Sequence, residues 1–224
     1  MGFDQSIQAF RQFCGADLTA TLAQIEASIR GVKAEQLAEA LPLVGASEST
    51  LAGAGHLKRL LGQLNVVIHA VGILVCLPKI LEPGETIESV SLGAGNTGRS
   101  FDLETDRRVA EFKFIRWQGG SETIRQNNLF KDFLLLAEHE TKKGKFLYVL
   151  ETHHALKFLN GGRALDSVLS KNVALYRQFQ ARHGGRYRTV REYYQPRRSL
   201  VQIEDVSPWL GGLMADEEAT EAGV

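Results

Sequence analysis

Residues 100–117 read SFDLETDRRVAEFKFIRW, and this stretch decides the fold of the chain. Apolar and polar side chains alternate from residue 101 to 104 and again from 110 to 114, which is the period of a half-buried strand. The polar residues between the two runs suit a tight turn. We therefore expect an antiparallel hairpin. The apolar side chains expected to share its core face are Phe101, Leu103, Ala110 and Phe112.

The register of this hairpin brings two carboxylates together. A loop of two or four residues centred on residues 106–107 places Leu103 opposite Ala110, and it therefore places Asp102 opposite Glu111. The Cβ atoms of such a pair lie about 4.5–5.5 Å apart, and like charges at that separation repel. A hairpin selected for stability alone would avoid this pairing. The register therefore indicates that something positive lies between the two carboxylates.

A divalent cation such as Mg²⁺ or Mn²⁺ would remove the repulsion, because hard cations bind carboxylate oxygens. Lys113 lies two residues beyond Glu111 on the same face of the strand, where it could hold or deprotonate a water molecule. The spacing therefore predicts a metal site made by Asp102 and Glu111, with Lys113 beside it.

Asp102 followed by Glu111-Phe112-Lys113 resembles the PD-(D/E)xK phosphodiesterase superfamily. The resemblance implies an α/β domain of the restriction-endonuclease-like fold, with a mixed β-sheet flanked by helices. It implies a Mg²⁺-dependent nuclease that acts on nucleic acid, more often DNA than RNA. By this resemblance Asp102 and Glu111 bind the metal, and Lys113 orients the attacking water. Phe101 stands where the family often has proline.

A second part of the resemblance lies in the helix expected after the triplet. Some branches of the family carry Gln-x-x-x-Tyr on that helix, and this chain has QNNLF at residues 126–130. The resemblance implies that Gln126 lines the catalytic site, while Phe130 lacks the hydroxyl of the family's tyrosine. Together the matching motifs cover about residues 55–151.

The composition is that of a globular chain. With 224 residues, a net charge of zero and 44% hydrophobic residues, it can bury one good core with an appended arm. Cys14 and Cys76 are far apart in apolar surroundings, which is typical of reduced thiols. No basic leader with an apolar core opens the sequence, so we expect a cytoplasmic location. The expected parts are a helical N-terminal arm (1–50), the nuclease-like domain (51–214) and an acidic, disordered tail (215–224).

Apolar residues recur every three to four positions in residues 4–50, which predicts helices. Asp17 should cap the second helix, and a third is expected at residues 34–41. Residues 43–55 are rich in Gly, Ala, Ser and Thr and are expected to form a linker. No side chains suited to catalysis gather here, so the arm is expected to pack against a second copy or a partner protein.

Residues 56–81 are the most apolar part of the chain. A membrane-spanning helix needs about 18–20 apolar residues, and the uninterrupted run covers only residues 66–77, with His69 inside it. We therefore expect a buried helix that covers a sheet, no membrane partner, and a core position for His69.

Residues 93–98, GAGNTG, follow an expected strand at 88–92 and match the G-x-G-x-x-G dinucleotide motif. That motif requires a helix directly after the glycines. A dinucleotide-binding enzyme with Glu111 as the ribose ligand is therefore one alternative. Residues 99–105 alternate as a strand, however, so we expect no affinity for NAD or FAD and no organic cofactor.

The C-terminal half predicts a helix at 121–140, with Ile124, Leu129, Phe133 and Leu136 buried, and then a parallel strand at 145–150. His153 and His154 are expected in a loop, with a helix at 167–183 and a strand at 186–194 after them.

Arginines mixed with tyrosines in residues 171–198 suit contacts with phosphates and bases. The alternatives are a solvated face, and a protein that binds nucleic acid or a partner on the same fold without catalysis. The arginines expected to bind nucleic acid are Arg177, Arg182, Arg186, Arg188, Arg191, Arg197 and Arg198.

Overall fold

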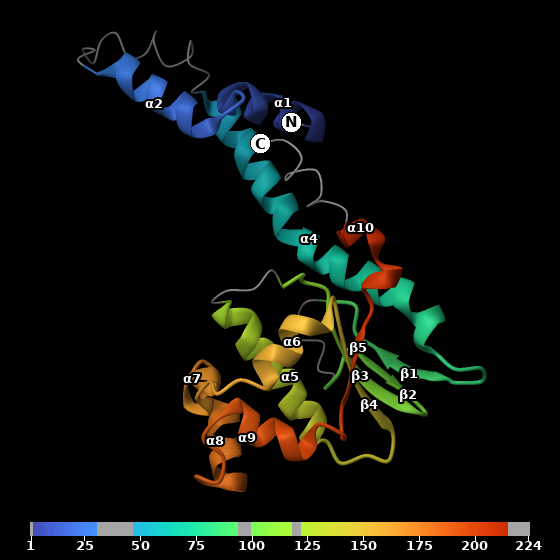
Figure 1. Cartoon of the computed structure of the whole chain (residues 1–224). Coiled ribbons are helices and arrows are strands. Elements are labelled where there is room, and N and C mark those ends of the chain that lie inside the picture. The colour runs from blue at the N-terminus through green and yellow to red at the C-terminus, as the bar shows by residue number, and fades with distance from the viewer. Residues whose placement is uncertain (1, 31–46, 94–99, 118–121, 215–224) are drawn as a thin grey trace. The chain divides into compact units, whose positions relative to one another are not determined.

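The computed structural model describes residues 2–30, 47–93, 100–117 and 122–214 (Figure 1). The chain divides into two compact units, Met1–Asn65 and Val66–Val224. In chain order the elements are α1 (Phe3–Cys14), α2 (Leu18–Ile29), α4 (Glu48–Ile80), β1 (Ile87–Val90), β2 (Leu103–Thr105), β3 (Arg108–Lys113), α5 (Thr123–Glu138), β4 (Gly144–Val149), α6 (Thr152–Leu159), α7 (Leu165–Leu169), α8 (Val173–His183), α9 (Val190–Tyr194), η1 (Gln195–Arg197), β5 (Gln202–Asp205), η2 (Ser207–Trp209) and α10 (Gly211–Met214).

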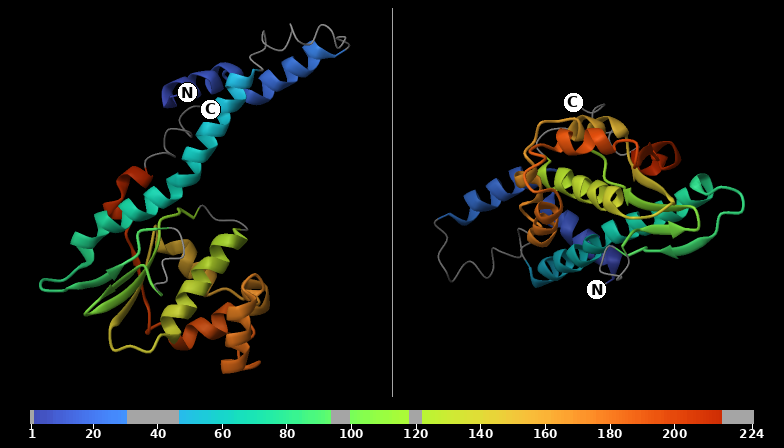
Figure 2. Two further views of the ribbon diagram at one scale, coloured as in Figure 1. Left: turned by 180° about the vertical axis from the view of Figure 1, so that it is seen from behind. Right: turned by 90° about the horizontal axis from the view of Figure 1, so that it is seen from below.

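The unit Val66–Val224 is built on one mixed sheet of five strands in the order β1-β2-β3-β4-β5 (Figure 1). The strands β1, β2 and β3 are antiparallel neighbours, whereas β3, β4 and β5 run parallel. Helices lie on both faces of the sheet (Figure 2). The expected α/β class, with a mixed sheet between helices, is therefore confirmed.

The expected hairpin is β2–β3. Leu103 pairs with Ala110 and Glu104 pairs with Val109, so the expected register is confirmed and the loop is the two residues at 106–107. One side chain departs from the prediction. Phe101 packs with the core on the α5 side of the sheet, whereas Leu103 and Ala110 pack with the core on the other side. The reason is that Phe101 precedes β2 in a bend, where strand alternation no longer applies.

Helix α5 makes the expected crossover between the parallel strands β3 and β4. Leu129, Phe133 and Leu136 are buried against the sheet, as predicted. Ile124 is 77% exposed, contrary to the prediction, because it lies in the first turn of the helix, ahead of the stretch that is buried.

The C-terminal part of α4, from residue 66 onward, covers the other face of the sheet. Ile73 and Cys76 are fully buried there. Gly72 is needed at this contact, because a Cβ atom on it would lie 2.7 Å from the Phe114 ring. The opposite side of the helix stays exposed, with Val71 and Leu74 about half accessible, so the expectation of a buried helix holds for one side only.

By length and composition, α4 is the one helix of the described residues that could cross a membrane. Only 17% of its most apolar 18-residue window is buried. It is also longer than expected, because it begins at Glu48 and includes residues 48–55, which the sequence assigned to a linker. Alanine and leucine favour the helix there and outweigh two glycines. The predicted boundary at residue 50 therefore lies inside a continuous helix.

The unit Met1–Asn65 contains α1 and α2, as predicted for the N-terminal arm. Asp17 caps α2, since its side chain accepts a hydrogen bond of 3.0 Å from the amide of Ala20. Cys14 and Cys76 are both free thiols. The predicted third helix at 34–41 and the tail at 215–224 lie outside the described residues.

The C-terminal part departs most from the sequence prediction. Residues 190–194 form helix α9 instead of a strand, because Thr189 caps the helix by accepting from the amide of Glu192. The single helix expected at 167–183 is two helices, since Asn172 caps α8. His153 and His154 lie in α6 and not in a loop. The strand β5 was not predicted.

A buried ion pair fixes the start of β3 to the segment before β1. The Arg108 guanidinium donates to both carboxylate oxygens of Glu85 at 2.6 Å, and Thr105 Oγ1 also donates to Glu85. Arg108 in addition donates to the Tyr148 hydroxyl at 3.0 Å. Burial would raise the pKa of Glu85, but the hydrogen bonds from Arg108 outweigh it and lower the pKa to about 2.

We predict that Glu85→Gln lowers the free energy of unfolding by about 3 kcal/mol at neutral pH, because Arg108 is left buried without its counter-ion. Urea unfolding measures this. Since the folded pKa lies below the unfolded one, the contribution is complete above pH 4.5 and is lost as the pH falls toward 2.

The control is Lys143→Ala, which removes ion pairs with the more exposed carboxylates of Glu88 and Glu104. It should cost no more than about 1 kcal/mol. Equal losses from Glu85→Gln and Lys143→Ala would contradict a structural role for the Glu85–Arg108 pair.

Candidate active site

Lys113 is the centre of a cluster of buried charges between the sheet and α5. Its Nζ lies 2.7 Å from Asp132 Oδ2 on α5 and 3.7 Å from Glu111 Oε2 on its own strand. The side chain of Asp132 is only 7% exposed, whereas that of Lys113 is 31% exposed. The Lys113 ammonium group is therefore paired with a buried carboxylate, while part of the lysine side chain stays accessible to solvent.

Asp102 lies directly before β2 and is held through both carboxylate oxygens. Oδ2 accepts a hydrogen bond of 3.0 Å from the amide of Phe112, and Oδ1 lies 3.2 Å from Nε2 of His69 on α4. Burial raises the pKa of Asp102, but the contacts with His69 and the Phe112 amide outweigh it and bring the pKa below its ordinary value. Asp102 is therefore a fixed, ionised carboxylate.

Glu111 is in the opposite electrostatic situation. Burial, together with the charges of Asp132 and Asp102, raises its pKa to about 9, although Lys113 partly offsets this. Glu111 is therefore protonated at neutral pH when no cation other than Lys113 is close. A further positive charge in this place would allow it to ionise.

Lys113 remains a cation. Burial lowers its pKa, but the interactions with nearby acids, those with Asp132 foremost, outweigh burial and raise the pKa above the ordinary value. A lysine in this state cannot accept a proton at neutral pH. Of the two roles expected from the sequence, positioning a water fits this environment, and removing its proton does not.

The donor set fits a hard cation of the kind predicted. Asp102 and Glu111 offer carboxylate oxygens, and Mg²⁺ is commonly bound by one or two carboxylates with water completing its shell. The raised pKa of Glu111 comes first from burial and then from the charges of Asp132 and Asp102, which a cation would offset. Among the described residues, no group of three or more His, Cys, Asp or Glu side chains is arranged to hold a metal ion. A cation here would therefore depend on two carboxylates and water.

The sequence analysis missed two residues of this cluster, Asp132 and His69. Asp132 was detectable in principle, because it lies among the buried positions of α5, three residues after Leu129 and four before Leu136. An acid in an apolar stripe needs a partner. His69 lies one turn before Ile73 on the side of α4 that faces the sheet, but its contact with Asp102 comes from tertiary packing.

The structure does not bring Gln126 into this cluster. Its side chain accepts a hydrogen bond from the guanidinium of Arg163. Phe130, at the family's tyrosine position, is fully buried and packs edge-on against Tyr193 at 5.6 Å. The catalytic role that the resemblance implied for Gln126 gains no support from these contacts.

The predicted arginine segment is divided between internal and external roles. Arg182 and Arg197 contact Glu138, and Arg191 Nε donates to the carbonyl of Asn160. Arg186 lies over the ring of Tyr187. These four arginines therefore support the local fold.

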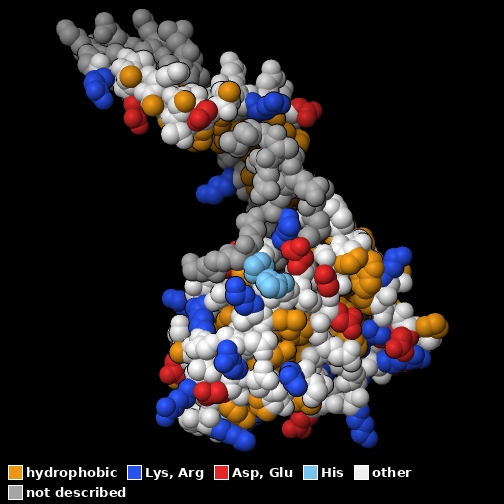
Figure 3. Space-filling model, viewed as in Figure 1, with side chains coloured by type: hydrophobic (Ala, Val, Ile, Leu, Met, Phe, Trp, Pro, Cys, Tyr) orange, Lys and Arg blue, Asp and Glu red, His pale blue; other side chains and the backbone are white. Residues whose placement is uncertain are grey.

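Arg177, Arg188 and Arg198 are exposed, and their side chains make no hydrogen bond or ion pair with the residues that the structure describes. They remain available to phosphates. Over the surface of Val66–Val224 seen in Figure 3, basic side chains are interspersed with acidic and apolar ones and form no single basic patch. Of the seven arginines predicted to bind nucleic acid, these three are the ones whose side chains have no hydrogen-bond or ion-pair partner among the described residues.

Most of the glycine motif, residues 94–98, lies outside the described residues. The strands β2 and β3 occupy positions 103–105 and 108–113, so no helix extends to residue 108, as dinucleotide binding would require. Comparison of the chain with protein-family models, with curated proteins and with solved structures found no match. The chemistry of the site is therefore inferred from its geometry.

The pKa of Glu111 leads to a prediction about stability without metal. Because its folded pKa, about 9, lies above the ordinary 4.5, the contribution of Glu111 is complete below pH 4.5 and is lost as the pH rises toward 9. In a chelator, the wild-type protein should lose stability over this window, and Glu111→Gln should remove most of the loss.

Thermal unfolding between pH 5 and 9 measures both slopes. Glu88→Gln, the same isosteric change at an exposed carboxylate on β1, is the control and should keep the wild-type slope. If the melting temperatures of the wild-type protein and Glu111→Gln change in parallel with pH, Glu111 is not the acid whose pKa is raised in the folded state.

Proposed function

We propose that this protein is a divalent-metal-dependent nuclease of the PD-(D/E)xK type, with the restriction-endonuclease-like fold, which hydrolyses phosphodiester bonds in nucleic acid. The observation that carries the proposal is the convergence of Asp102, Glu111 and Lys113 at one end of the β2–β3 hairpin. DNA is the proposed substrate, ahead of RNA, and the cytoplasm is the proposed location.

Asp102 and Glu111 would hold Mg²⁺ or Mn²⁺, which would supply Lewis acidity to a phosphate oxygen and acidify water. His69 and the Phe112 amide keep the Asp102 carboxylate in one orientation. In hydrolysis the water oxygen forms a bond to phosphorus, the ester P–O bond breaks, and the leaving oxygen ends as a hydroxyl.

Lys113 stabilises the negative charge that develops on the phosphate oxygens and keeps the water in line, because its ammonium is protonated and partly exposed. Asp132 positions Lys113 through the 2.7 Å ion pair. The exposed Arg177, Arg188 and Arg198 would contact the backbone of the nucleic acid.

A second candidate is a protein that binds nucleic acid or a partner on the same fold without catalysis. It is favoured by the contact of Gln126, whose side chain accepts a hydrogen bond from Arg163. The exposed apolar side of α4 also suits a protein partner, as would the N-terminal helices in a homo-oligomer.

The nuclease proposal predicts cleavage that depends on Mg²⁺ or Mn²⁺ and stops with a chelator. Plasmid DNA, single-stranded DNA and RNA should each be offered. Glu111→Gln and Lys113→Met should each lower the cleavage rate at least about 100-fold, since each removes a charge that acts in the transition state. Binding should change little.

The matched control is the double variant Arg188→Ala/Arg198→Ala. It should weaken binding to all sequences and reduce the salt slope by about two, with the rate at saturation nearly kept. If the wild-type protein binds these substrates but cleaves none of them, the non-catalytic candidate replaces the nuclease.

Metal binding is predicted separately from activity. Mn²⁺ at about one hundred times its Kd should stabilise the wild-type protein by about 2.7 kcal/mol, because it binds the folded state alone. Glu111→Gln should lose most of this gain, and Glu88→Gln should keep it. Equal gains for all three proteins in thermal unfolding would place the cation elsewhere.

A further inference from the structure

A hollow of about 840 Å³ lies between α5 and α8 and is closed on one side by Ser100 and Phe101. Its volume is within the range of about 300–1,000 Å³ that is typical of small-molecule sites. It belongs entirely to the unit Val66–Val224. None of the roles assigned above to the Lys113 cluster (His69, Asp102, Glu111, Lys113 and Asp132) uses it.

Rings line the hollow in two pairs. Phe101 and His139 meet edge-on with centroids 4.8 Å apart where α5 ends, and Phe179 and His183 lie 4.9 Å apart on α8. Leucines of both helices complete the apolar wall. Such walls suit a flat, aromatic ligand that contacts the rings at their edges, since Phe101 and Phe179 are themselves buried.

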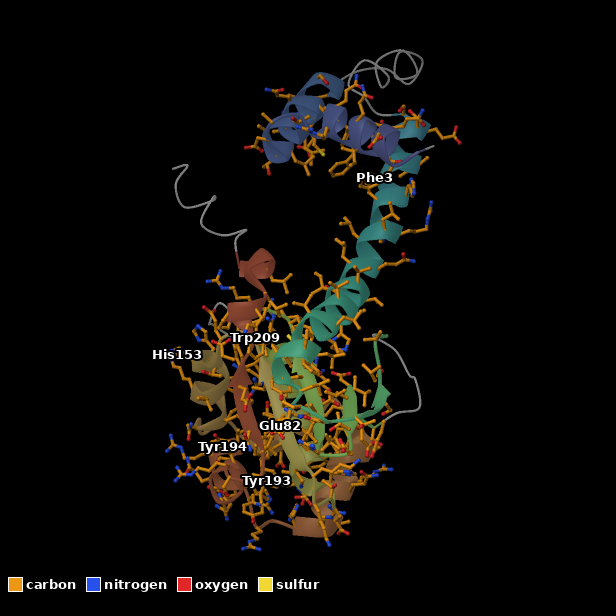
Figure 4. All side chains as sticks on the ribbon, turned by 90° about the vertical axis from the view of Figure 1, so that its right-hand side faces the viewer. Phe3, Glu82, His153, Tyr193, Tyr194 and Trp209 are labelled. Atoms are coloured by element: carbon orange, nitrogen blue, oxygen red, sulfur yellow. The ribbon has the colours of Figure 1, made fainter. Side chains whose placement is uncertain are left out.

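One end of the hollow is lined by charged side chains. Glu138 accepts hydrogen bonds from Arg182 at 2.5 Å and from the hydroxyl of Tyr193 (labelled in Figure 4) at 2.5 Å, and it lies 3.1 Å from His183 Nε2. Arg197 is 3.6 Å from the same carboxylate. Two guanidinium groups face the Glu138 carboxylate, and Glu140 also acts electrostatically on Arg182. The side chain of Arg182 is 59% exposed and can contact an anion without leaving the hollow.

Gln178 adds a polar side chain that can form hydrogen bonds with the edge of a ligand's ring. It is exposed on α8, lines the hollow, and its amide makes no hydrogen bond with the residues that the structure describes. An amide offers both a donor and an acceptor, which is the combination that nucleobase edges pair with.

Two residues that line the hollow are close in the chain to residues of the Lys113 cluster. Phe101 is the chain neighbour of Asp102, and the lining residue Leu135 lies one turn beyond Asp132 on α5. Three residues of helix rise about 4.5 Å, which is less than the spacing of successive nucleotides in an extended strand. A ligand in the hollow would therefore lie within one or two nucleotides of the cluster.

We propose that this hollow binds one unpaired nucleotide, with the base among the four rings and the phosphate at Arg182. Its place in a strand beside the Lys113 cluster rests on the proposed nuclease function, whereas the ligand chemistry, a flat ring carrying a phosphate, does not. A base stacked in a duplex cannot enter without unpairing. The site therefore selects single strands or frayed ends.

The experiment measures binding in a chelator, so that cleavage cannot contribute. The probes are a fluorescent single-stranded oligothymidine, the same chain with abasic positions, a duplex of equal length, and thymidine monophosphate as competitor. The wild-type protein should bind the oligothymidine about fivefold or more tightly than the abasic chain, since one stacked base contributes at least that much.

Ala181→Trp fills the hollow from an exposed lining position and should reduce binding of the oligothymidine to the level of the abasic chain. Ala174→Trp, on the same helix but outside the lining, is the matched control and should bind as the wild type does. Gln178→Ala is a milder second variant and should lose part of the preference, so a folding defect in Ala181→Trp cannot hide the result.

Equal affinity of the wild-type protein for the abasic and the normal chain would overturn the proposal, as would an unchanged preference in both Ala181→Trp and Gln178→Ala. Competition by thymidine monophosphate at concentrations that match the oligothymidine would assign the hollow to a free nucleotide. Base-dependent binding without any cleavage in Mg²⁺ would keep this inference and remove the nuclease proposal. Cleavage without base-dependent binding would keep the nuclease proposal and remove this inference.

Discussion

The ion pair between Lys113 and Asp132 is the interaction on which the rest of the site depends. Two charges inside a protein cost several kcal/mol in lost hydration, and only their mutual attraction and further hydrogen bonds offset that cost. Here the pair joins β3 to α5, the helix that covers the sheet. The pair also acts on the neighbouring acids, although burial is the largest influence on the pKa of Glu111. Lys113 is held as a cation, and Glu111 becomes the acid that the cluster cannot ionise without help.

The two carboxylates of the hairpin therefore differ in protonation state in the proposed site. Asp102 is ionised and held by contacts at both oxygens, whereas Glu111 is protonated until positive charge arrives. Cation binding at neutral pH would thus release a proton, as expected for a ligand that must first ionise. This asymmetry supports the proposed divalent cation independently of any likeness to a family.

The hairpin could be predicted because its information is local. Alternation of apolar and polar residues on both sides of a two-residue turn fixes the register, and a slip by one residue would turn every side chain to the wrong face. The crossover through α5 followed from the same kind of pattern. Asp132 and His69 could not be placed with Asp102, because they come from other helices and only packing brings them near. Helix α9 had a local signal, Thr189 followed by Glu192, but the alternation of residues 186–194 concealed it.

The most direct test of the central claim is a crystal structure at high resolution of the protein soaked in Mn²⁺. The proposed site predicts an anomalous peak between the carboxylates of Asp102 and Glu111, with Lys113 still paired with Asp132. Glu111 should then be ionised and should contact the ion. A crystal in which Mn²⁺ binds elsewhere, or in which Glu111 stays protonated and bonded to a neighbouring carboxylate, would contradict the claim that this cluster is a metal site.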